Sequence, residues 1–178
     1  VGPWLTIANL ANIAWLYAWL NERIGLSLIL MLLILLPLLI VVIRLNMERW
    51  DAPFPIIAYV WWPLCAYSGW ITVATIANVS SFLVSIGWEA LLSPAGWSVT
   101  MVIVATIVNL LMIILRNMRE FALVGVWALA AISVRQWDIV PAIQYSALAG
   151  AMILLVAISI HGFINRATNP LVKYMQYR

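Results

Sequence analysis

The amino-acid sequence predicts an all-α membrane protein, a polytopic bundle of about six transmembrane helices. Of its 178 residues, 66% are hydrophobic and only 8% are charged, whereas soluble domains carry roughly 25% charged residues. The apolar residues form near-continuous runs and do not alternate with a period of two, which favours helices over a β-barrel. Short polar segments separate the runs, so we expect a single transmembrane domain over residues 1–178.

Six apolar segments approach or exceed the length of about 20 residues that a spanning helix needs. The third contains Pro63, so we expect a kink or a tilt in that helix. The fifth is short, and it is either a thin span or a re-entrant segment. The predicted spans are Trp4–Leu20, Leu26–Ile43, Ile56–Leu83, Val99–Leu115, Phe121–Val134 and Ile139–Ile164.

The distribution of basic residues predicts the orientation of the chain. With six spans, two basic residues, Arg23 and Arg135, lie on one face of the membrane, and the other seven share the opposite face. Because basic residues concentrate on the cytoplasmic side, we expect both termini on the cytoplasmic or equivalent side of a bacterial inner membrane or an organellar membrane. The seven residues are Arg44, Arg49, Arg116, Arg119, Arg166, Lys173 and Arg178.

The sequence contains no HExxH, CxxC, GxSxG, P-loop or GxGxxG motif. We therefore expect a protein that is not an enzyme, with no metal site and no nucleic-acid partner.

The single cysteine, Cys65, is expected to be a small packing residue. The single histidine, His161, is interfacial or, alternatively, an axial ligand of a haem or chlorophyll. Glu22, Glu48 and Glu120 stand beside arginines, and we expect them to form ion pairs in the loops or to be charges at helix ends.

The chain begins Val1-Gly2-Pro3 without an initiator Met, so we expect a processed or truncated N-terminus.

Polar and aromatic residues inside the third span form a candidate pocket. Trp70, Ala74 and Asn78 are spaced four residues apart, which predicts one shared helix face, and Tyr67 adjoins that face. An aromatic wall beside a small residue and an amide is typical of a site for a flat, mostly apolar ligand. The alternative is ordinary helix packing, in which the asparagines hydrogen-bond between helices.

Two spans resemble helices of the TspO/MBR family, the tryptophan-rich sensory or translocator proteins. The segment from Ala66 to Asn78 keeps the Tyr, Trp, Ala, Thr and Asn of the family's last helix, whose pattern is close to Pro-Tyr-Leu-Ala-Trp-Val-Ser-Phe-Ala-Thr-x-Leu-Asn. Asn12 and Trp15 match the Leu-Asn-x-x-Trp-Ser of the family's third helix. Two features depart from the family pattern: Ala66 replaces a proline, and the Trp-x-Pro-Pro-Gly-Trp segment is absent.

The resemblance covers residues 4–83, so residues 1–83 are similar to helices three to five of that family and residues 84–178 add three further spans. It implies a helical pocket for a porphyrin or for a sterol-like or isoprenoid ligand. The residues that would line this pocket are Asn12, Trp15, Tyr67, Trp70, Ala74 and Asn78.

Three functions compete at this stage. The first is binding of a flat hydrophobic ligand, tetrapyrrole or isoprenoid-like, for sensing or transport. The second is a structural or accessory subunit of a larger membrane complex, one that could carry pigments, and the third is a lipid or small-molecule transporter. The cofactor stays unknown, with porphyrin, chlorophyll and carotenoid as the candidates. The expected partners are membrane lipids, a hydrophobic small molecule and either further copies of the chain or other membrane subunits.

Overall fold

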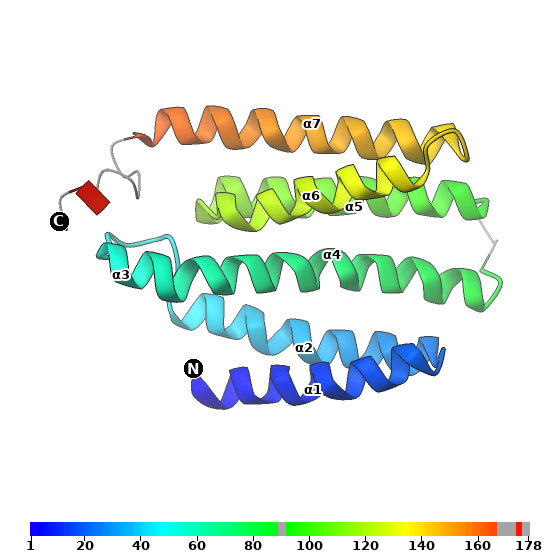
Figure 1. Ribbon diagram of the computed structural model, residues 1–178, viewed down its shortest axis with the longest axis horizontal. Helices are drawn as coiled ribbons and strands as arrows, with labels where there is room; N and C mark the ends of the chain where they lie inside the picture. Colours follow the sequence, from blue (N-terminus) through cyan, green and yellow to red (C-terminus); the bar gives the residue numbers. More distant parts are fainter. Residues whose placement is uncertain (89–91, 167–173, 176–178) are drawn as a thin grey trace.

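The described residues form six long α-helices that lie side by side (Figure 1). The structure is a computed structural model, and it describes residues 1–88, 92–166 and 174–175. A short helix, α3 (Phe54–Ile56), and a π-helical segment, η1 (Ile57–Trp61), lead directly into α4. The long helices are α1 (Gly2–Leu20), α2 (Ile24–Arg44), α4 (Trp62–Ser85), α5 (Pro94–Arg116), α6 (Arg119–Arg135) and α7 (Pro141–Ile164).

The order of the helices in space differs from their order in the chain. Helix α1 packs on α2, α2 on α4, α4 on α6, α6 on α7, and α7 on α5. Helix α5 also contacts α4 and α6, so α4, α5, α6 and α7 surround a common space. Helices α1 and α2 form a hairpin on the outer side of α4 (Figure 1).

The ends of α5 follow from local sequence signals. Ser93 is its N-cap, because the Ser93 hydroxyl oxygen accepts a hydrogen bond from the Gly96 backbone N–H at 3.2 Å, and Pro94 occupies the first turn. The helix therefore begins five residues before the predicted start at Val99. It ends at Asn117, whose left-handed backbone (φ 59°) stops the helix and allows α6 to begin almost at once.

The predicted irregularity near Pro63 takes the form of the π-helical segment. Pro63 lies in the first turn of α4 and has no N–H to donate to the carbonyl of Tyr59, one α-helical turn earlier. The preceding residues Ile57–Trp61 widen into a π-helix, which is a common way for a helix to absorb such a break.

Within the described residues, four helical segments are long and apolar enough to cross a membrane: α2, the continuous Phe54–Ser85 segment, α5 and α7. Helix α1 has sufficient length, but its asparagines and tryptophans lower its hydropathy. Helix α6 has 17 residues, about 25 Å at 1.5 Å per residue, against a hydrocarbon thickness of about 30 Å. A polytopic helical membrane bundle is therefore confirmed, and six crossings stay a prediction.

Basic residues gather at one end of the bundle. Arg44 and Arg116 end α2 and α5, and Arg119 begins α6. The two basic residues predicted for the opposite face, Arg23 and Arg135, stand at the start of α2 and the end of α6. The start of α1 and the end of α7 lie at the same end as Arg44 (Figure 1). Lys173 and Arg178 lie outside the described residues.

Candidate functional site

A chain of hydrogen bonds joins three helices and includes the side chains of two predicted site residues and the backbone carbonyl of a third. The Trp15 indole N–H on α1 donates to Ser27 Oγ on α2 over 2.9 Å. Ser27 Oγ in turn donates to Asn78 Oδ1 on α4 over 2.7 Å, and Asn78 Nδ2 donates to the Ala74 carbonyl over 3.1 Å. Ser27 and Asn78 are buried, so these bonds satisfy interior polar groups and hold α1, α2 and α4 together.

Tyr67 and the side chain of Ala74 lie close to this chain of hydrogen bonds. Tyr67 and Ala74 on α4 are partly buried, and with Trp15 they pack against an apolar cluster between α1, α2 and α4. The Tyr67 hydroxyl is buried and has no hydrogen-bond partner among the described residues. Asn12 is half-buried on α1. The cluster consists of Ala8, Ala11, Met31, Ile34, Leu38 and Ile71.

Trp70 does not join the other predicted residues. Its side chain is 52% exposed, and it lies with Trp127 of α6 beside a shallow hollow of about 470 Å³ on the outer face of α4 and α6. Trp70 and Asn78 are eight residues apart, and at about 100° per residue they point about 80° apart around the helix. That angle is enough to place one in the interior and the other on the outer face.

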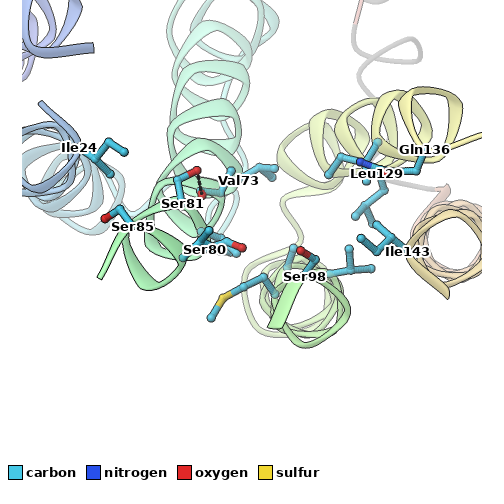
Figure 2. A pocket seen from close by; sticks show the side chains of 16 residues that line it. Ile24, Val73, Ser80, Ser81, Ser85, Ser98, Leu129, Gln136 and Ile143 are labelled. Atoms are coloured by element: carbon cyan, nitrogen blue, oxygen red, sulfur yellow. Dashed lines mark hydrogen bonds between the residues drawn. The ribbon is translucent and has the colours of Figure 1, made fainter. Parts of the chain in front are cut away.

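A second hollow lies elsewhere, between α4, α5, α6 and α7. It has a volume of about 530 Å³, which falls in the range of small-molecule sites. Figure 2 shows side chains from these helices around it. Its lining comes from the end of α4, the start of α5, the end of α6 and the starts of α2 and α7: Ile24, Val73, Ile76, Ala77, Ser80, Ser81, Val84, Ser85, Ser98, Met101, Val102, Ala105, Leu129, Ile132, Gln136 and Ile143.

The lining of this cavity is aliphatic with a few neutral polar groups. Ser81 and Ser98 donate to carbonyls of their own helices, Ala77 O at 3.1 Å and Pro94 O at 3.0 Å (Figure 2 draws the first). Ser80 makes no side-chain hydrogen bond within the described part of the chain, so its hydroxyl is available to a ligand. None of the described residues in this lining is charged or aromatic.

The sequence contains signals for both Ser27 and the cavity serines, although neither was predicted. Ser27 is the single hydroxyl residue of α2, and a lone polar residue in an apolar span usually faces another helix. Ser80, Ser81 and Ser85 cluster at the end of α4. The cavity itself could not be predicted, because its volume depends on how far apart four helices are held.

His161 lies away from this cavity, near the end of α7. Its ring nitrogens are 3.3 and 3.4 Å from Asn165 Nδ2, and the side chain is only partly buried. Neither ring nitrogen faces the cavity lining. The interfacial interpretation of His161 agrees with this position at a helix end.

The comparison with known families gives one result that covers most of the chain. Residues 1–160 match the family described as TSPO-like protein. This range extends well beyond residue 83, where the residue-by-residue resemblance ended. No curated protein and no solved structure gives a match to this chain.

Proposed function

The chain belongs to the TSPO-like protein family, and from that premise we propose that it binds a hydrophobic small molecule, for sensing or transport, and is not an enzyme. The observation that carries the proposal is the cavity of about 530 Å³ between α4, α5, α6 and α7. Three of the four helices that form its walls, α4, α5 and α7, are long and apolar enough to span a membrane, so an apolar ligand dissolved in the bilayer has a short path into it.

The chemistry of the cavity favours an uncharged, mainly aliphatic ligand of the sterol or isoprenoid class. Aliphatic side chains offer the contact that such a skeleton needs, and Ser80 offers a hydrogen bond to a single hydroxyl or carbonyl group. A tetrapyrrole with carboxylate side chains would gain most from cations and aromatic rings. The described lining contains neither, so we place tetrapyrroles second.

The proposed topology has six crossings, with both termini on the side that carries Arg44, Arg116 and Arg119. It is supported by the position of these residues at one end of the bundle and by the positive-inside rule. Helix α6 crosses in this proposal despite its 17 residues, because a short span is accommodated by local thinning of the bilayer.

Filling the cavity is expected to weaken ligand binding. Ala77 lines the cavity from α4, and Ala77→Phe would occupy part of its volume. We expect an affinity for a fluorescent sterol, dehydroergosterol, about tenfold weaker than in the wild type, equivalent to about 1.4 kcal/mol. The measurement is a titration of the purified protein in detergent, followed by energy transfer from tryptophan to the sterol.

The matched control is Ala130→Phe, an exposed position on α6 that does not line the cavity. Equal sterol affinity in Ala77→Phe and in the wild type would refute the cavity as the site. The aromatic face predicted from the sequence, which includes Trp70, is tested by titrating protoporphyrin into the wild type and into the Trp70→Leu variant. Porphyrin binding that depends on Trp70 and ignores Ala77→Phe would move the site to that face.

A second function, as a subunit of a larger membrane complex, is favoured by the outer face of α4 and α6. Trp70 and Trp127 are 52% and 70% exposed near the middle of their helices, whereas lipid-facing tryptophans concentrate at the membrane interfaces. Ala66, Leu123 and Val124 complete the hollow between them. A small residue beside exposed aromatic rings would admit the helix of another chain.

A double variant, Trp70→Leu with Trp127→Leu, tests this second function. If the hollow seats another copy of the chain, we expect wild-type protein in mild detergent to have the mass of an oligomer and the double variant that of a monomer. Size-exclusion chromatography with light scattering measures the mass. Trp137→Leu, at an equally exposed tryptophan outside the hollow, is the control. A monomeric wild type would exclude self-association through this face.

A further inference from the structure

Three potential metal ligands converge at the end of the bundle opposite the cavity. Glu48 lies in the connection after α2, Cys65 in the first turn of α4 and Glu120 in the first turn of α6. One carboxylate oxygen from each glutamate and the Cys65 sulfur all lie within 4.8 Å of one another. Separate segments of the chain thus bring a thiol and two carboxylates together, a combination that packing alone does not require.

Cys65 lies in apolar, closed surroundings, whereas Glu48 and Glu120 are partly exposed. Cys65 is 0% exposed and belongs to an apolar cluster with Met47, Trp61, Met118 and Phe121. A divalent cation between two neighbouring carboxylates would offset their mutual repulsion. Glu120 stands in the first turn of α6, at the helix end where acidic side chains are favourably placed.

The Cys65 thiol and one carboxylate oxygen of Glu120 have no hydrogen-bond partner in the described part of the chain. The Cys65 thiol makes no hydrogen bond within the described residues, although it is fully buried and lies in the cluster. Glu120 Oε2 is buried and lacks a hydrogen-bond partner there. Glu120 stands in the first turn of α6, the position of a helix-end charge.

Two arginines at this end of the bundle each direct one donor to the end of a neighbouring helix. Arg116 Nη2 donates to the Val42 carbonyl and Arg49 Nη2 to the Leu115 carbonyl, each over 3.2 Å. These bonds satisfy the last carbonyls of α2 and α5.

We propose that Glu48, Cys65 and Glu120 form a binding site for a divalent transition-metal ion, with Zn²⁺ as the best fit. Thiolate and carboxylate ligands suit Zn²⁺ at about 2.3 and 2.0–2.2 Å, whereas Mg²⁺ and Ca²⁺ take oxygen ligands only. Tetrahedral bonds of those lengths place ligand atoms about 3.3–3.7 Å apart. Rotation about the side-chain bonds of the two glutamates must therefore bring the ligand atoms slightly closer together. The three ligands leave the fourth position to water. The bound ion would link the α2–α3 connection, α4 and α6, and this site was not expected from the sequence.

Cobalt is a suitable probe, because Co²⁺ replaces Zn²⁺ and a thiolate–Co²⁺ bond absorbs strongly in the near ultraviolet. Titration of the metal-free protein in detergent with Co²⁺ is expected to give this absorption at one ion per chain, and Zn²⁺ is expected to displace it. Cys65→Ser should abolish the absorption, and Glu120→Gln should weaken binding at least about tenfold. Glu22→Gln, an exposed glutamate at the other end of the bundle, should change nothing.

A measurement on the unmodified chain covers the case in which a variant fails to fold. X-ray absorption of the Zn²⁺-loaded wild type should show one sulfur at about 2.3 Å and otherwise oxygen, and Cys65 is the single cysteine. A zinc shell without sulfur, or the absence of cobalt absorption in the wild type, would overturn the proposal. Unchanged cobalt binding in folded Cys65→Ser would do the same.

Discussion

Gly69→Ala is expected to destabilise the bundle by about 1–3 kcal/mol, the usual cost of overpacking a closely packed contact. A methyl group at Gly69 would lie 2.8 Å from the Phe121 carbonyl oxygen and 3.3 Å from the Phe121 Cα. Both are backbone atoms of α6, so no side-chain rotation can relieve the contact and α4 and α6 must move apart. The closest approach of these helices therefore depends on the missing side chain.

The loss is measured by unfolding with SDS in mixed micelles, followed by circular dichroism. Gly25→Ala is the matched control, because a methyl group there would meet only the Phe82 ring at 3.6 Å, an ordinary contact. We expect Gly25→Ala to leave stability within a few tenths of a kcal/mol or to raise it slightly. Equal stability of the two variants would show that α4 and α6 are not held at this distance.

Ser27→Ala is expected to cost about 1–3 kcal/mol, since it leaves a buried amide oxygen and a partly buried indole N–H without a partner. Both the indole N–H of Trp15 and Oδ1 of Asn78 lose the hydroxyl that joins them. Because Ser27 is fully buried, neither group can turn to water without separating the helices. The effect should exceed the average of about 0.6 kcal/mol for one interhelical bond in a membrane protein.

The same SDS unfolding measures this effect, with the Trp15 fluorescence environment as a second readout. Ser159→Ala is the control, because Ser159 is exposed and its hydroxyl donates only to the Leu155 carbonyl of its own helix. A double variant, Ser27→Ala with Asn78→Leu, should recover part of the loss, since it removes a stranded amide. If Ser27→Ala and Ser159→Ala were equally mild, the hydrogen-bond chain would not be a structural link.

The helices could be predicted from sequence because a bilayer requires long apolar runs, and the polar connections mark their ends. The sequence predicts the start of α5 at Val99, five residues later than the observed start. The apolar run begins there, and a polar serine and a proline, Ser93 and Pro94, look like part of the connection when only composition is considered. The sequence predicts that asparagines inside the spans hydrogen-bond between helices, as Asn78 does with Ser27, but Asn109 does not do so within the described residues. It is fully buried, and its amide donates within its own helix, to Ala105 O at 2.8 Å.

The candidate site was only partly predictable. Trp15, Tyr67, Ala74 and Asn78 do gather around one interhelical region, because the spacing of polar residues along α4 gives a usable face. The outward position of Trp70 depends on the rotation of α4 against α6, which is set by the contact at Gly69. The cavity depends on such contacts in four helices, such as Gly150 against Thr106, and no single span contains that information.

The π-helical segment Ile57–Trp61 has a consequence for any alignment of this chain with a relative. A π turn holds one residue more than an α turn, and one residue corresponds to about 100° of rotation. A relative whose helix is α-helical throughout must therefore be aligned with a one-residue gap inside the helix. Without that gap, residues before Ile57 would be assigned to the wrong face, while the segment from Ala66 to Asn78 would still align correctly.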